Sequence, residues 1–235
     1  MVQLPTQMLP QLYTQLMEQI KARLDVVREA LNTGFDQRAD PYAFIHIETA
    51  LLNVRRITEL LALAVLLAHN EHQDFRTSSL MKAWNPDAIF NRLTKLNVEG
   101  FPRAVEVGET DSEGVMELFI HDTGYLDRES VCRIYHDCCD RLHAGSLKAL
   151  MSGVKKYDLG EIQSWAREIK RLLNNHVILL PERQRTMIVF MAVAPDGHVE
   201  CELHNMIMTE ELGSGPLVTR RYRSAHAADV VRPSD

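Results

Sequence analysis

The stretch PYAFIHIETALLNVRRITELLALAVLLAH, residues 41–69, decides the fold. In its second half, residues 57–68, only Thr58 and Glu59 are polar. A helix that is apolar on every side has to be covered on every side. The uninterrupted apolar run, residues 60–68, has about half the length that a membrane-spanning helix needs. The stretch therefore predicts the central helix of a helical bundle and no membrane span.

Two arginines lie shortly before Glu59 in this stretch. Arg55 and Arg56 stand four and three positions before Glu59, and residues at these spacings are neighbours on a helix surface. Charged side chains next to a buried apolar segment need partners, because removing an ion from water is costly. We predict an internal ion pair that ends at the bundle surface; the alternative is a charged anchor in a cleft.

The rest of the chain predicts four further helices and two hairpins. Apolar residues at helical spacing predict helices over residues 8–33, 86–96, 127–144 and 159–175. Asp127 is the expected N-cap of the fourth helix in the chain, and Leu126 and Val131 stand where a hydrophobic staple would form. Alternating apolar residues predict hairpins within residues 103–120 and 186–206.

These elements predict one α+β domain that is mainly α. It covers residues 1–212, with a helical bundle around the central helix, the hairpin 103–120 inserted between helices, and the hairpin 186–206 near the C-terminus. Residues 213–235 are polar and rich in glycine and arginine, and we expect a disordered tail there. A bundle of this size with a wholly apolar central helix also predicts a homodimer. A second copy related by a two-fold axis is the commonest way to cover the apolar surface of such a bundle.

Composition excludes some classes of function. The net charge of −6 and the pI of about 5.9 argue against a broad nucleic-acid footprint, which normally makes a domain basic. The first twelve residues lack the charged and apolar segments of a signal peptide, which predicts a cytoplasmic location with reduced cysteines. The sequence contains no glycine-rich phosphate loop, nucleophile elbow or dinucleotide fingerprint, so we predict no cofactor.

One helix concentrates residues that bind metals. Cys132, His136, Cys139 and His143 recur at spacings of four, three and four, which places them on one stripe. The stripe is about 16 Å long, too long for one ion to bind all four side chains. We predict a packed helix face and no metal; the alternative is a zinc enzyme in which a neighbouring pair is completed from another helix.

The same helix carries arginines on another face. Arg133, Asp137 and Arg141 recur every four residues, a pattern typical of a solvated salt-bridge ladder. The alternative is a phosphate-facing arginine strip. Arg133, Arg141 and His143 are accordingly the candidate ligand-binding residues of this helix.

The layout of the helices resembles the HEPN superfamily. Two long helices, the second ending ELLALAVLLAH, precede a pair that contains YHDCCDRLHAG and SWAREIKRLLNNH, over roughly residues 8–177. The resemblance implies a helical bundle that is commonly dimeric, in a family with many members in prokaryotic toxin, CRISPR-associated and abortive-infection systems. Many of these members are metal-independent ribonucleases.

The HEPN resemblance also implies an active motif, an arginine followed four to six residues later by a histidine. Arg171 and His176 match that spacing and become the candidate catalytic pair, with His176 as base and Arg171 on the phosphate. Leu172 follows the arginine, where active members often have a polar residue. Three classes of function follow: a binding or regulatory protein, with a prokaryotic defence or stress system as its candidate setting; a HEPN-like ribonuclease that binds RNA; and a metal-dependent enzyme.

Overall fold

The computed structural model describes residues 8–33, 42–70, 77, 80–96, 100–110, 115–121, 123–143, 151, 158–180, 185–193, 195–206 and 217–221. The helices are α1 (Met8–Thr33), α2 (Ala43–Ala68), the short 3₁₀ helix η2 (Leu80–Lys82), α3 (Pro86–Lys95), α4 (Arg128–Leu142) and α6 (Leu159–Leu173). The strands are β1 (Arg103–Thr110), β2 (Val115–Ile120), β3 (Asn175–Leu179), β4 (Arg185–Val193), β5 (His198–Met206) and β6 (Leu217–Arg221).

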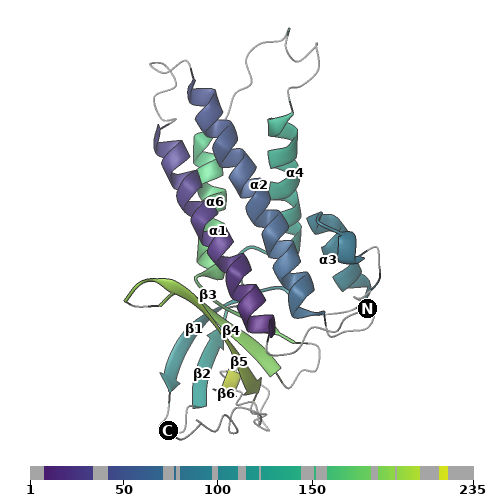
Figure 1. Cartoon of the computed structure of the whole chain (residues 1–235), viewed down its shortest axis with the longest axis vertical. Helices are drawn as coiled ribbons and strands as arrows, with labels where there is room; N and C mark the ends of the chain where they lie inside the picture. Colours follow the sequence, from purple (N-terminus) through teal and green to yellow (C-terminus); the bar gives the residue numbers. More distant parts are fainter. Residues whose placement is uncertain are drawn as a thin grey trace, which may run out of the picture.

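The molecule has a helical half and a sheet half. The helices α1, α2, α4 and α6 run side by side along the long axis, α3 lies beside α2 and α4, and the strands gather at one end (Figure 1). The five longer helices lie within a few residues of their predicted bounds, and α2 is the central helix that the sequence predicted. Ile57, Leu61 and Val65 of α2 are fully buried. No helix among the described residues is both long enough and apolar enough to cross a membrane.

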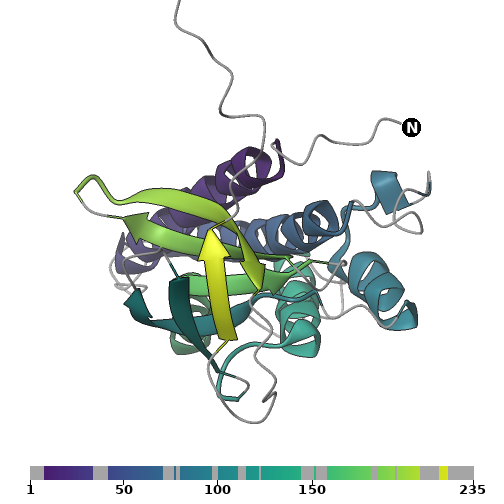
Figure 2. The same ribbon diagram turned by 90° about the horizontal axis from the view of Figure 1, so that it is seen from below.

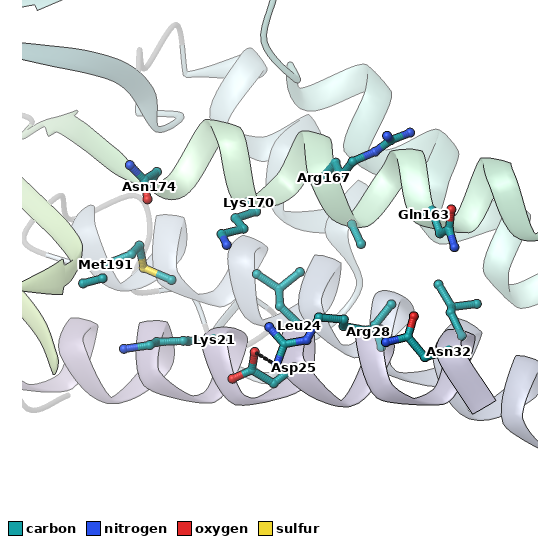
Figure 3. A pocket seen from close by; sticks show the side chains of 14 residues that line it. Lys21, Leu24, Asp25, Arg28, Asn32, Gln163, Arg167, Lys170, Asn174 and Met191 are labelled. Atoms are coloured by element: carbon teal, nitrogen blue, oxygen red, sulfur yellow. Dashed lines mark ion pairs between the residues drawn. The ribbon is translucent and has the colours of Figure 1, made fainter. Parts of the chain in front are cut away.

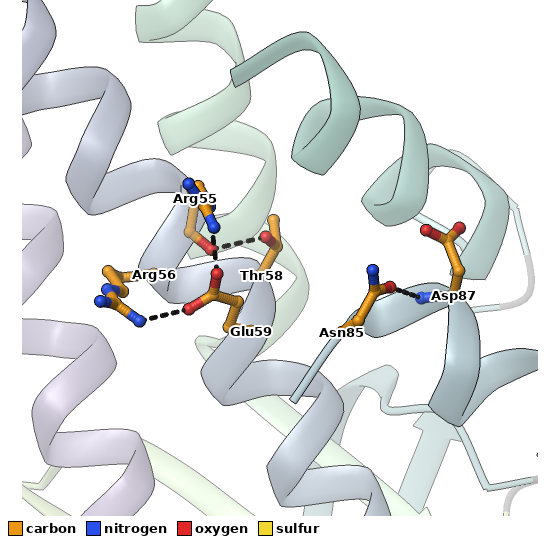
Figure 4. A network of polar contacts seen from close by, with 6 residues as sticks. All are labelled: Arg55, Arg56, Thr58, Glu59, Asn85 and Asp87. Carbon is orange, nitrogen blue, oxygen red and sulfur yellow. Dashed lines mark hydrogen bonds and ion pairs between the residues drawn. The ribbon is translucent and has the colours of Figure 1, made fainter. Parts of the chain in front are cut away.

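Local signals explain where the helices begin. The Asp127 carboxylate accepts a hydrogen bond from the Ser130 backbone N–H at 2.8 Å, which caps α4 as predicted. Hydrogen bonding by the Ser130 side chain, together with this backbone bond, lowers the pKa of Asp127, because it stabilises the charged carboxylate. Asn85 caps α3 in the same way through the Asp87 N–H at 2.8 Å (Figure 4). Asp158 caps α6 through Glu161 N–H at 3.1 Å.

The predicted ion pair of α2 is present. Glu59 accepts from Arg55 Nε at 3.1 Å and from Arg56 Nη1 at 2.8 Å (Figure 4). The Glu59 side chain is only 6% exposed, whereas those of Arg55 and Arg56 are 29% and 55% exposed. The carboxylate is therefore compensated by two arginines that reach the bundle surface.

The sheet differs from the prediction of two separate hairpins. All six strands are antiparallel and hydrogen-bonded in the order β1-β2-β6-β5-β4-β3, and β1 also pairs with β3, so the sheet closes on itself (Figure 2). The closing pairs set Arg103 opposite Val177 and Ala104 opposite His176. The predicted hairpins are present as β1–β2 and β4–β5, but they are parts of one curled sheet.

Two strands lie where the sequence predicted none. Residues 175–179, expected as a helix end and a connector, form β3. Residues 217–221, expected in a disordered tail, form β6 between β2 and β5. The other residues of that predicted tail lie outside the described residues.

Strands β1, β3 and β4 contribute to two cores. On β4, Met187, Val189 and Met191 belong to the main core that the helices share. Between them, Ile188 packs with Val105, Leu118 and Val177 in a second, small core, with Phe190 against it. Successive side chains of a strand point to opposite faces, so a strand buried on both faces needs a continuous apolar run. The sequence MIVFMAV of β4 meets this need.

The β4–β5 hairpin is more buried than its alternating pattern predicted. His204 was expected on the exposed face with Glu200 and Glu202, yet it is 1% exposed. Its Nε2 lies 2.9 Å from a Glu202 carboxylate oxygen, which supplies a polar partner. Closure of the sheet covers the face of the β4–β5 hairpin that an isolated hairpin would expose to solvent.

Candidate functional site

Three contacts fasten α1 to the sheet and set one end of the candidate site. The Glu18 carboxylate accepts from the Val199 backbone N–H at 2.6 Å, and Lys21 Nζ donates to the Gly197 carbonyl. Gly197 has φ +74°, a turn conformation that suits glycine. The Tyr13 hydroxyl lies 3.0 Å from His176 Nε2 on β3. The position of α1 relative to β3, β4 and α6 is thereby fixed.

Two pockets meet at the C-terminal half of α6; together we call them the α6 groove. The α1 lobe, about 410 Å³, is lined by Lys21, Leu24, Asp25, Val27, Arg28, Leu31, Asn32, Gln163, Ala166, Arg167, Lys170, Asn174, Met191 and Ala192 (Figure 3). The β1 lobe, about 360 Å³, is lined by Ala104, Val105, Tyr125, Arg167, Lys170, Arg171, Asn174 and Asn175. Arg167, Lys170 and Asn174 line both lobes. Both volumes lie in the range of small-molecule sites.

The groove is basic although the chain is acidic. Five cationic side chains line it, namely Lys21, Arg28, Arg167, Lys170 and Arg171, and one carboxylate, that of Asp25. The local formal charge is therefore +4, against −6 for the whole chain. A concave surface lined by charges of one sign concentrates ions of the other sign.

Some of these cations are already engaged. Arg28 pairs with Asp25 at 3.0 Å, and Lys21 donates to the Gly197 carbonyl. The Arg171 guanidinium lies over the Tyr125 ring, 4.5 Å from its centroid. Arg167 and Lys170 form no salt bridge with any other residue that the structure describes. These two side chains, shared by both lobes, are therefore the cations available to a bound anion.

Stabilisation of helix α6 explains the position of some of these cations. Lys170 and Arg171 stand in the last turn of α6, where cations are stabilised by the helix dipole. That account does not extend to Lys21 and Arg28, which lie in the middle and later part of α1. Nor does it explain why the cations of two helices border the same cavity.

The candidate catalytic pair of the sequence is not brought together. Arg171 lies in the β1 lobe, whereas His176 is fully buried on β3. Its Nδ1 lies 2.8 Å from the Leu173 carbonyl, which can only accept, so Nδ1 carries the proton and Nε2 accepts from Tyr13. Burial lowers the pKa of His176 from 6.5 to about 4 and raises the pKa of Tyr13. Both ring nitrogens are thus used inside the core.

The candidate ligand-binding residues of α4 lie elsewhere. Arg141 pairs with Glu161 of α6 and lies over the Trp165 ring, 4.9 Å from its centroid, so it joins two helices. Arg133 is exposed on α4, and His143 is the C-cap residue of that helix. None of the three lines the α6 groove.

The Cys/His stripe of α4 has structural contacts. Burial, together with the neighbouring Asp87 carboxylate of α3, raises the pKa of the Cys132 thiol to about 12. His136 Nε2 lies 2.8 Å from the same carboxylate. In the described part of the chain, no three histidine, cysteine or acidic side chains form a group that could hold a metal ion.

Comparisons with protein-family models, with curated proteins and with solved structures give no match. The α6 groove therefore has to be interpreted from its own chemistry. Arg167, Lys170 and Arg171 are visible in the sequence as charges on the margin of an amphipathic helix. What sequence reasoning missed is their proximity to Lys21 and Arg28, because that depends on α1 and α6 packing together.

Proposed function

We propose that this protein is a binding module whose ligand is an anion held in the α6 groove. The observation that carries the proposal is that Arg167 and Lys170 line both of the adjoining pockets and have no acidic partner among the described residues. Arg171 adds a third cation, and Asn174 adds amide groups that can donate to oxygen atoms. Cationic and amide donors of this kind suit a phosphate or carboxylate group.

The test is a calorimetric titration with inorganic pyrophosphate. We expect saturable binding to the wild type that weakens as salt is added, because the contact is electrostatic and exposed. The double variant Arg167→Glu/Lys170→Glu should weaken binding at least tenfold. The matched control, Lys82→Glu/Lys95→Glu, makes the same change in net charge at exposed positions near α3 and should bind as the wild type does.

Two results would contradict the proposal. In one, the wild type gives no saturable heat at millimolar pyrophosphate. In the other, both double variants lose affinity equally, which would mean that net charge rather than the groove attracts the anion. Circular dichroism of all three proteins establishes that each is folded.

A ribonuclease of the HEPN type is the second candidate, and one observation favours it. Arg171 lies over Tyr125, whose ring stacks on His121 at 5.6 Å between centroids. Aromatic rings beside cations are typical of surfaces that bind single-stranded RNA. Catalysis by His176 would require this residue to leave the core, so RNA binding without cleavage is the simpler form of this candidate.

Cleavage of single-stranded and transfer RNA in EDTA separates binding from catalysis. We expect no cleavage by the wild type. Cleavage that persists in EDTA and disappears in a folded His176→Gln variant would instead support the ribonuclease. A role in a prokaryotic defence or stress system belongs to the same proposal and rests on the HEPN resemblance alone.

A further inference from the structure

The two lobes of the α6 groove differ in chemistry. The β1 lobe is mixed, with Tyr125, Arg171 and Asn175 beside the apolar Ala104 and Val105. The α1 lobe has an apolar floor, formed by Leu24, Val27 and Leu31 of α1 together with Met191 of β4. Val27, Leu31 and Met191 are 0%, 2% and 7% exposed, so this floor is the surface of the main core.

The cations stand at the rim of this apolar lobe. In Figure 3, Lys170 points from α6 into the space above α1, and Leu24 points from α1 toward it. Met191 closes the end next to the sheet, and Arg167 projects away from α1. A ligand whose charge lies between Arg167 and Lys170 would therefore find the larger apolar surface in the α1 lobe.

From this arrangement we propose that the ligand is a single-chain amphiphilic anion, a phosphate or carboxylate carried on an alkyl chain. The anionic group binds Arg167 and Lys170, and the chain lies over Leu24, Val27 and Met191. Charge complementarity selects this occupant, because a neutral chain would leave the rim cations without a counter-charge. The proposal rests on the proposed function, since the same two cations hold the anion.

The size and character of the lobe fit this class of ligand. At about 410 Å³ the α1 lobe lies in the range of small-molecule pockets. Met191 adds an unbranched side chain that can adjust to chains of different length. Each methylene removed from water adds roughly fourfold to affinity, so the length of the chain has a measurable effect.

The experiment compares methyl phosphate with octyl phosphate by calorimetry, below the concentration at which octyl phosphate forms micelles. We expect octyl phosphate to bind the wild type at least tenfold more tightly than methyl phosphate. Leu24→Asn, which places an amide on the apolar floor, should lower the ratio of octyl phosphate affinity to methyl phosphate affinity toward one. Leu52→Asn, a matched change at an exposed leucine of α2, should leave both affinities unchanged.

A second variant keeps the test decisive if Leu24→Asn does not fold. Ala166→Phe fills the lobe from α6, where Ala166 is only partly buried. It should weaken the binding of octyl phosphate at least tenfold relative to the binding of methyl phosphate.

The outcomes separate this inference from the proposed function. Equal affinity of the wild type for both phosphates would overturn the inference and leave anion binding in place. Binding of neither phosphate would overturn both. If light scattering shows that Leu24→Asn dissociates a dimer and octyl phosphate does not bind, the lobe is a contact between copies of the chain, and the inference is again overturned.

Discussion

At the scale of single residues, two polar groups of the core, the His176 imidazole and the Glu59 carboxylate, have specific partners. Tyr13 and His176 are both fully buried, and each supplies what the other lacks, a hydroxyl donor and an imidazole acceptor. Glu59 is compensated by Arg55 and Arg56. The Glu59 pairs were predictable because they lie within one helix turn. Tyr13 and His176 are 163 positions apart, and no local pattern connects them.

Removing the hydroxyl of Tyr13 tests the first pair. Tyr13→Phe leaves Nε2 of His176 buried without a donor, so we expect the free energy of unfolding to fall by about 1–3 kcal/mol. Urea denaturation at pH 7 measures the change. Tyr42→Phe is the control, because Tyr42 is 64% exposed, and its change should stay within about 0.5 kcal/mol. Equal effects of the two substitutions would mean that the Tyr13 hydroxyl contributes nothing specific.

The buried imidazole also makes stability depend on pH. The pKa of His176 is lowered from 6.5 to about 4 in the folded protein, so between these values the unfolded chain binds a proton that the folded chain does not. Stability is therefore full above about pH 6.5 and falls as the pH drops toward 4. One such group contributes a slope that approaches about 1.4 kcal/mol per pH unit.

Urea denaturation between pH 7 and pH 4 measures this slope. A folded His176→Gln variant should lose that part of the dependence, whereas His198→Gln, at an exposed position on β5, should retain it. An unchanged slope in His176→Gln would assign the pH dependence to other groups.

At the scale of elements, helices were the predictable part of the fold. Apolar spacing and the caps at Asp127 and Asn85 act within a few residues, and the helices follow them closely. The strand β3 was missed because residues 175–179 follow directly after α6, with Asn174 as the only residue between them. What makes these residues a strand is their pairing with β4 and β1, which is a long-range interaction.

Shortening one leucine side chain on the buried side of α2 and one on its exposed side tests the place of this helix in the bundle. Leu61 is fully buried and Leu52 is 44% exposed. We expect Leu61→Ala to lower the free energy of unfolding by about 2–5 kcal/mol through lost burial and a cavity. Leu52→Ala, the same substitution on the same helix, should cost about 0.5 kcal/mol. Denaturant titrations of both variants give the comparison, and similar losses would contradict a central position for α2.

At the scale of the whole molecule, the fold class was predicted and the joining of its parts was not. The α+β class, the bundle and both hairpins follow from the sequence. The closed sheet depends on β6 pairing with both β2 and β5, and the α6 groove depends on α1 packing beside α6. The individual cations of the groove could be named from the sequence, but their convergence could not.

The expected homodimer belongs to this scale. The described surface includes two exposed apolar side chains at the start of α2, those of Phe44 and Ile45. Exposed apolar surface is a common part of protein interfaces. Light scattering at micromolar concentration should give twice the chain mass of 26.8 kDa, and Ile45→Glu should lower that value toward one chain. A wild-type mass of a single chain would contradict the dimer.

Biosynthesis delivers the strands in sequence order, and β6 comes last among them. Until residues 217–221 leave the ribosome, β2 and β5 each have one side without its partner strand. Unpaired edges of this kind can recruit strands of other chains. The helical bundle, built largely from contacts between neighbouring helices, can form earlier, because local contacts form faster than long-range pairing. Nascent chains therefore pass through a stage with a formed bundle and an open sheet, and for that period the unpaired edges of β2 and β5 are the part of the protein most dependent on chaperones.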